Sequence, residues 1–156
     1  MIASAFEHIK ISGVSAAVPT RKVCSAKYEK LFGKETVEKI VASTGVKECY
    51  HVHEKQTSSD LAFAAAEHLL QVKNIDPKTI GVLVFVVAYA DYHVPASAMV
   101  LQKRLKLPQD CIVYDINLAC SGIVYGLQTV ASLLQCSTAQ RALLLTGDIT
   151  SKVVSP

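Results

Sequence analysis

The chain has 156 residues, of which 51% are hydrophobic and 19% are charged, and its net charge is +3 at neutral pH. This length suits one domain with a buried core, and the mild charge without a basic run argues against a nucleic-acid-binding protein. The longest apolar run, residues 82–90, is far shorter than the ~20 residues of a membrane span. Because so little charge covers the surface, we expect another subunit or further chain to cover part of it.

The cysteines and the start of the chain indicate the cellular compartment. Five cysteines, at positions 24, 49, 111, 120 and 136, form no CxxC pair. Residues 1–8 lack the basic and apolar regions of a secretory signal. We therefore expect free thiols, a cytoplasmic location and no membrane span.

Segments typical of strands and of helices alternate along the chain. Residues 80–88 form a continuous apolar run, which indicates a strand buried on both faces of a parallel sheet. Thr57 and Asp60 predict the capped start of a long helix, and Ser25 is placed to cap a short one. Helices are predicted over residues 25–32, 36–42, 61–72, 96–105 and 123–134, strands over residues 9–18, 80–88, 112–118 and 141–146, and an exposed strand or loop over residues 46–53. This alternation predicts one α/β domain over residues 1–156, with a mainly parallel sheet flanked by helices.

Cys120 lies at the junction of a predicted strand and a predicted helix, among the small residues Ala119, Ser121 and Gly122. The first N–H groups of a helix carry a partial positive charge, which favours the thiolate form of a cysteine placed there. Small neighbours allow a substrate carbonyl to approach the sulfur. The pattern therefore predicts a nucleophilic thiol, against the alternative of an inert cysteine buried under the helix.

The segment around this cysteine, Asp115-Ile-Asn-Leu-Ala-Cys120-Ser-Gly-Ile-Val-Tyr-Gly-Leu127, resembles the active-site elbow of ketoacyl-ACP synthase III, a condensing enzyme of the thiolase superfamily. The similarity includes residues 43–46, 93–97 and 142–148, and so covers nearly the whole chain. It implies a thiolase-like layered fold and an acyltransferase of fatty-acid or related acyl-chain synthesis. Cys120 would take an acyl group from acyl-CoA or acyl-ACP as a thioester, before decarboxylative condensation with malonyl-ACP, without a permanent cofactor or metal.

The resemblance also implies residues and a partner that lie elsewhere. Members of the family carry the histidine and asparagine that assist decarboxylation in the second half of their chain, and nothing here matches them. We therefore expect residues 1–156 to be the amino-terminal part of a longer enzyme, inactive in condensation alone. The family is dimeric, and Val94 stands where its members often place a phenylalanine in the neighbour's acyl pocket. A homodimer with room for a longer or branched acyl chain is expected.

Two positions depart from the family pattern. Lys39 and Ser43 stand where the family commonly has a tryptophan and an arginine that hold the adenine of coenzyme A. Neither residue offers an aromatic face or a guanidinium fork. This predicts weak recognition of the coenzyme A nucleotide and a larger role for the acyl-carrier protein, and no cofactor-binding residue is assigned.

The histidines are candidates for a base or a metal ligand. His93 follows the apolar strand in a loop from which it could approach Cys120, whereas His68 is expected at the surface. Cys49, His51 and His53 alternate, so they would share one face of a strand. Zinc on that face would need a fourth ligand from elsewhere, and a plain edge strand is the favoured interpretation.

Three alternative functions stay open. The chain could be a non-catalytic dimerisation or scaffold half whose cysteine is vestigial. A hydroxymethylglutaryl-CoA synthase-like enzyme would carry a glutamate base where Ala90 stands, with Asp91 one residue away. A redox-sensing protein would need a resolving thiol near Cys120, and Cys111 is predicted at the opposite end of the preceding strand.

Overall fold

The computed structural model describes residues 5–153 and divides the chain into two compact units. The layered unit comprises residues up to Ala17 together with residues 57–148, and the hairpin unit comprises residues 18–56 together with those from Ile149. Residues 1–4, part of the stretch interpreted as lacking a secretory signal, lie outside the described residues. Within residues 5–153, no helix is both long and apolar enough to cross a membrane.

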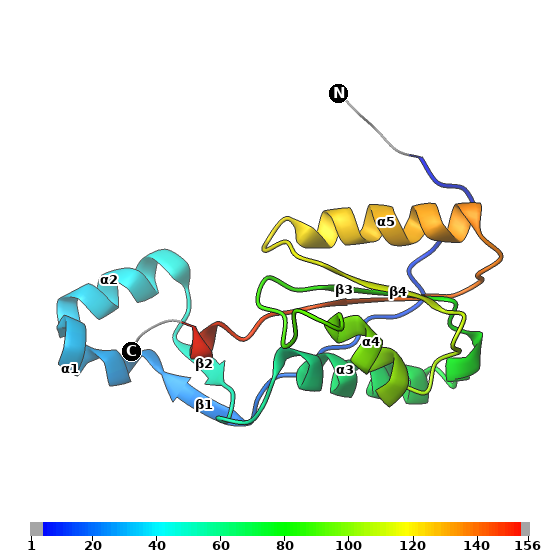
Figure 1. The fold of residues 1–156 in the computed structure, drawn as a ribbon. Helices are drawn as coiled ribbons and strands as arrows, with labels where there is room; N and C mark the ends of the chain where they lie inside the picture. Colours follow the sequence, from blue (N-terminus) through cyan, green and yellow to red (C-terminus); the bar gives the residue numbers. More distant parts are fainter. Residues whose placement is uncertain (1–4, 154–156) are drawn as a thin grey trace. The chain divides into compact units, whose positions relative to one another are not determined.

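The layered unit is built on a parallel sheet of three strands in the order β4-β3-β5 (Figure 1). The strands are β3 (Val82–Val86), β4 (Ile112–Ile116) and β5 (Ala142–Thr146). Val86 at the end of β3 is in register with Ile116 on one side and Thr146 on the other. All three strands therefore end together, and the loops that follow them meet at one edge of the sheet.

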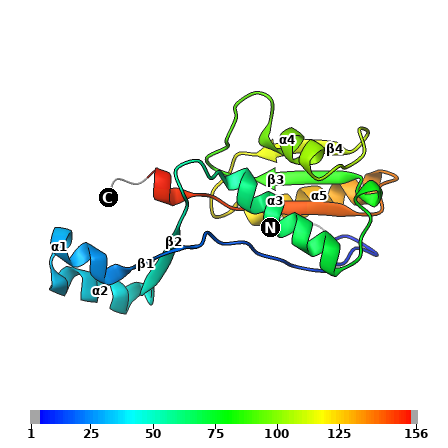
Figure 2. The same cartoon turned by 90° about the horizontal axis from the view of Figure 1, so that it is seen from below.

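Helices cover both faces of this sheet (Figures 1 and 2). The helices α3 (Ser58–Val72) and α4 (Ser97–Arg104) pack on one face, and α5 (Gly122–Cys136) packs on the other. A short 3₁₀ turn, Pro77–Thr79, leads from α3 into β3. The expected α/β fold, with a parallel sheet flanked by helices, is confirmed.

The core of the layered unit forms because β3 is apolar at every position and completely buried. Alternate side chains point to opposite faces of a strand. Leu83 and Phe85 pack with Leu101 of α4, whereas Val84 and Val86 lie on the face covered by α5. Full burial of one such side chain stabilises the fold by ~1.5–3 kcal/mol, so this strand anchors the unit.

The start of α3 has the capping box that its sequence predicts. The Thr57 amide donates to Asp60 Oδ2 at 3.0 Å, and the Asp60 amide donates to Thr57 Oγ1 at 3.3 Å. Arg104 of α4 donates to Asp60 Oδ1 at 2.9 Å and lies 4.4 Å from the Phe63 ring centroid. Burial raises the pKa of Asp60, but the hydrogen bonds from Thr57 and Arg104 outweigh it and hold the pKa below its ordinary value. The ionised carboxylate therefore joins two helices.

The hairpin unit pairs two short antiparallel strands, β1 (Arg21–Cys24) and β2 (Glu48–His51). Between them lie a 3₁₀ turn (Ser25–Tyr28), α1 (Glu29–Phe32) and α2 (Lys34–Thr44). The helix α2 ends at Gly45, whose φ of 72° is in the left-handed region that glycine adopts without strain. A last 3₁₀ turn, Thr150–Lys152, is joined to Val52 through the Ser151 hydroxyl.

Two local expectations are wrong. The segment 9–18 forms no strand within the described residues, and its apolar side chains Ile11 and Val14 are exposed. An alternating pattern alone cannot make a strand, because each strand also needs a hydrogen-bonding partner. Ser25 does not cap the helical segment, because Cys24 is the capping residue and no side chain bonds there.

Candidate active site

Cys120 lies in the turn between β4 and α5, two residues before the first helical residue, Gly122. Its side chain is exposed. The turn is closed by a 2.8 Å hydrogen bond from the Gly122 amide to the Ala119 carbonyl. The capping residue, Ser121, makes no side-chain hydrogen bond to this end of α5. Cys120 thus lies beside the start of the helix, where the partial positive charge of the helix dipole is concentrated.

The start of α5 is held tightly against the end of β3. A Cβ atom placed on Gly122 would lie 2.4 Å from Val86 Cγ1, and one on Gly126 would lie 2.8 Å from Val86 Cγ2. Real Cβ contacts are never this short, so only glycine allows the helix to approach the strand so closely. These two contacts fix where the turn carrying Cys120 stands above the sheet edge.

Carboxylates organise the loops at this edge. Asp115 on β4 accepts hydrogen bonds from the Ser97 and Ala98 amides, at 2.7 and 2.8 Å, and so caps α4 from a neighbouring element. Asp148 accepts from the Ala88 and Tyr89 amides after β3, at 3.0 and 2.9 Å. The sequence analysis assigned neither role. Both roles could have been predicted from an aspartate at or just after the end of an apolar strand, because the loops that follow parallel strands meet at that edge of the sheet.

The loop after β3 holds the two residues considered as possible bases. His93 is exposed there. The Asp91 carboxylate instead accepts from the Ser58 hydroxyl at 2.8 Å and the Ser59 amide at 3.1 Å, at the start of α3. Burial raises the pKa of Asp91, but hydrogen bonds from Ser59 and Ser58 outweigh it and hold the pKa below its ordinary value. An ionised helix cap engaged in this way is poorly suited to act as a base.

The other cysteine near β4 has a different environment. Cys111 is buried, and burial together with the charge of Asp110 raises its pKa to about 11. It precedes β4, whereas Cys120 follows it. A thiol kept protonated at the opposite end of a strand is unsuited to resolve a sulfenic acid on Cys120.

The positions that depart from the family pattern are engaged within the hairpin unit. Lys39 Nζ lies 2.8 Å from Glu35 Oε1 on the same helix, and the Ser43 hydroxyl donates to the Ile40 carbonyl at 3.0 Å. In the layered unit, Val94 is 88% exposed. His68 is exposed, as predicted, and its Nδ1 atom lies 3.2 Å from the Ser15 hydroxyl oxygen.

The residues considered as zinc ligands do not assemble into a metal site. His53 lies beyond the end of β2 and is hydrogen-bonded to the Thr20 hydroxyl at 3.4 Å. Among residues 5–153, no three histidine, cysteine or acidic side chains are grouped so that they could hold a metal ion. Cys49 and His51 do share a face of β2, as the alternation predicted.

Comparison with known proteins agrees with this geometry. Residues 114–156 match the family model for 3-oxoacyl-[acyl-carrier-protein] synthase III. A β-ketoacyl-[acyl-carrier-protein] synthase III from Rhizorhabdus wittichii is 31% identical over 144 residues, which are 92% of this chain and 44% of the relative. The crystal structure of a 3-oxoacyl-(acyl-carrier protein) synthase from Burkholderia xenovorans superposes with a TM-score of 0.86 at 32% identity, over 91% of this chain and 42% of that one.

A more distant structure shares the fold alone. A variant of OleA from Xanthomonas campestris has a TM-score of 0.84 at 23% identity, over 95% of this chain and 47% of its own. The chain spans less than half of the length of these relatives. The fold is thus thiolase-like, and the chain is similar in sequence and structure to the amino-terminal part of 3-oxoacyl-[acyl-carrier-protein] synthase III enzymes.

Proposed function

We propose that Cys120 is the acyl-accepting nucleophile of a condensing enzyme of the 3-oxoacyl-ACP synthase III type. The observation that carries this proposal is the exposed thiol in the turn before α5, at the edge where the three parallel strands end. Nucleophiles gain from such a position, because the helix start stabilises the thiolate and the surrounding loops can shape a pocket. The family match from residue 114 onward includes this cysteine.

The proposed chemistry has two stages. In the first, the Cys120 sulfur bonds to the carbonyl carbon of an acyl thioester, the carbon–sulfur bond of the donor breaks, and the carrier thiol leaves with a proton. In the second, a malonyl group on the acyl-carrier protein loses carbon dioxide. The resulting carbanion attacks the acyl carbon and releases Cys120. Backbone amides of the turn can meet the oxyanion formed in the first stage.

The decarboxylation stage calls for additional groups. In the family, a histidine and an asparagine stabilise the developing charge, and removing one such donor typically costs ~100- to 1000-fold in rate. Residues 1–156 expressed alone are therefore expected to accept an acyl group slowly and to form no β-ketoacyl product. Product from this segment alone would mean that another residue, such as His93, assists decarboxylation.

The complete protein allows a direct test of the nucleophile. After incubation with an acyl thioester, peptide mass spectrometry should find the acyl group on Cys120, and addition of malonyl-ACP should yield a β-ketoacyl product. Cys120→Ala should abolish both, while Cys136→Ala, which alters an exposed thiol at the other end of α5, should abolish neither. Product formation by Cys120→Ala would overturn the proposal, and a complete absence of acylation would favour a scaffold role.

The acyl donor is proposed to be a carrier-protein thioester more than a coenzyme A thioester. Lys39, which is paired with Glu35, and Ser43, whose hydroxyl bonds within α2, offer neither an aromatic face nor a guanidinium fork to an adenine nucleotide. Competition between acyl-CoA and the matching acyl-ACP, with the complete protein, measures the preference. A clear preference for the coenzyme A form would contradict this part of the proposal.

A homodimer is the proposed assembly, with the loop before α4 at the contact. Tyr92 and Val94 of this loop and Met99 of α4 are exposed apolar residues of the kind that subunit contacts cover. Val94 would then lie beside the partner's acyl pocket. Sedimentation of the complete protein should give a dimer, and Val94→Asp should weaken it. A stable monomer at high concentration would count against this arrangement.

A further inference from the structure

A second cysteine, in the hairpin unit, lies beside a potential base. Cys49 Sγ is 3.4 Å from His51 Nε2, because the two residues alternate on one face of β2. The Tyr28 hydroxyl lies 3.4 Å from the same nitrogen, where its oxygen can accept a hydrogen bond once Nε2 carries the thiol proton. The Cys49 sulfur also lies 3.7 Å from the Val23 carbonyl oxygen. A thiol within hydrogen-bond reach of an imidazole is the arrangement of a cysteine nucleophile with its base.

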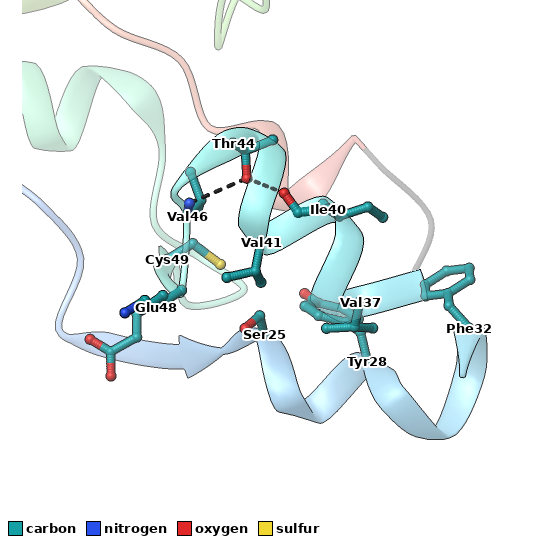
Figure 3. Close-up of a pocket in the computed structure, with 11 residues that line it drawn as sticks. Ser25, Tyr28, Phe32, Val37, Ile40, Val41, Thr44, Val46, Glu48 and Cys49 are labelled. Carbon is teal, nitrogen blue, oxygen red and sulfur yellow. Dashed lines mark hydrogen bonds between the residues drawn. The ribbon is translucent and has the colours of Figure 1, made fainter. Parts of the chain in front are cut away.

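The same thiol lines a cavity. A pocket of about 390 Å³ lies between α2, the 3₁₀ turn and β2 (Figure 3), within the range of roughly 300–1,000 Å³ usual for small-ligand sites. Its walls include Val37, Ile40 and Val41, and the Cys49 sulfur points towards Val41. The pocket therefore brings an apolar group next to a nucleophile.

Polar residues also line the pocket, namely Ser25, Tyr28, Thr44, Lys47 and Glu48, and Thr44 has its hydrogen bonds made within the protein. The Thr44 hydroxyl donates to the Ile40 carbonyl at 2.8 Å and accepts from the Val46 amide at 3.2 Å (Figure 3). With these bonds made, Thr44 has little to offer a polar ligand. A hydrocarbon chain is the occupant whose chemistry fits the walls.

We propose that Cys49 and His51 form a second acyl-accepting site, which takes a medium-length hydrocarbon acyl group into this pocket. His51 Nε2 receives the thiol proton as the Cys49 sulfur bonds to the carbonyl carbon of an acyl thioester. The donor's carbon–sulfur bond then breaks, and the imidazolium returns the proton to the leaving thiolate. No oxidant or reductant is needed. The choice of a thioester donor rests on the function proposed above, whereas the Cys49 site itself does not depend on Cys120.

The test uses the complete protein carrying Cys120→Ala, so that no acyl group can pass through Cys120. Octanoyl-N-acetylcysteamine and acetyl-N-acetylcysteamine are compared, and acylation of each cysteine is timed by peptide mass spectrometry. Cys24 and Cys136 are exposed thiols that serve as internal references. We expect Cys49 to react at least about tenfold faster with the octanoyl than with the acetyl donor, and at least about tenfold faster than either reference thiol with octanoyl.

Two variants assign the roles. His51→Gln should slow acylation of Cys49 by about 100-fold, without changing the reference thiols. His53→Gln, which alters the neighbouring histidine bonded to Thr20, should change nothing. Ile40→Glu, at a rim position that is 53% exposed, should remove the preference for the octanoyl chain.

Three results would each overturn the proposal: equal rates at Cys49 and the reference thiols, no dependence on chain length, or no effect of His51→Gln. The first two comparisons use no substitution in the hairpin unit, so they decide the matter even if a variant fails to fold. In a parallel experiment with Cys120 intact, acylation of Cys49 without acylation of Cys120 would reject the proposed function alone. Acylation of Cys120 without Cys49 would reject this proposal alone.

Discussion

The layered unit and the hairpin unit each carry a cysteine that we propose as an acyl acceptor, but they position it by different means. In the layered unit, a completely buried strand and two close glycine contacts hold the turn that carries Cys120. In the hairpin unit, neither β1 nor β2 is fully buried, and Cys49 owes its environment to side chains that surround an open pocket. Close packing of the backbone thus fixes the position of Cys120, whereas neighbouring side chains determine the environment of Cys49.

This difference teaches how each site should respond to change. A site held by backbone packing depends on residues that never touch a substrate, such as Val86 beneath Gly122. A site held by side chains depends on its immediate neighbours, here His51 and Tyr28. We therefore expect mutations that disturb the packing of the layered unit to lower its stability most. Mutations beside Cys49 should mainly change the reactivity of that thiol.

The largest expected effect is on the core of the layered unit. Phe85→Ala removes a ring that is 0% exposed, and its loss should cost ~3–5 kcal/mol of unfolding free energy through lost burial and a cavity. The matched change in the hairpin unit, Phe32→Ala, removes a ring that is 56% exposed and should cost about 1 kcal/mol or less. Urea unfolding of both variants measures the contrast, and equal losses would contradict the division described above.

The next effect concerns the contact that positions Cys120. Gly122→Ala places a Cβ atom 2.4 Å from Val86 Cγ1, so α5 must shift. We expect a loss of ~1–3 kcal/mol in stability, together with slower acylation of Cys120. Gly147→Ala is the control, because no atom lies within 4 Å of its Cβ position, and it should change stability by less than ~0.5 kcal/mol. A stable, fully active Gly122→Ala variant would show that the close approach is unnecessary.

A smaller effect is expected from acid. Because the folded-state pKa of Asp91 is below its unfolded value, this carboxylate contributes stability that is present above the unfolded pKa, ~3.9, and is lost as the pH falls through the lower folded value. Asp91→Asn should be less stable at neutral pH and should lose less stability on acidification. Thermal unfolding between neutral pH and pH 3 measures this difference. Parallel pH curves for the two proteins would assign the acid sensitivity to other groups.

The sequence predicts most of the layered unit better than the hairpin unit, for physical reasons. The strand β3 and the capped start of α3 depend on local patterns, namely an apolar run and the Thr57–Asp60 pair, which need no knowledge of the rest of the fold. The exception in the layered unit is the segment 9–17, whose alternation lacks a partner strand. In the hairpin unit, β1 was not predicted, because its four residues depend on pairing with β2. The contact between Tyr28 and His51 beside Cys49 could not be predicted either, because these two residues lie 23 positions apart in the chain.

The smallest expected effect tests whether the surface of the hairpin unit contributes to substrate binding. Lys39 lies at the surface of α2, where it pairs with Glu35 in an exposed arrangement that contributes little to stability. If the nucleotide of coenzyme A is not held there, Lys39→Ala should change the KM for acyl-CoA in the complete protein by less than about twofold, as befits the loss of an exposed pair. Lys34→Ala, which removes the similar pair with Glu38 on the same helix, is the matched control. A KM raised selectively by Lys39→Ala would mean that this lysine leaves Glu35 to meet a phosphate, and that the hairpin unit recognises substrate by its charges as well as by its pocket.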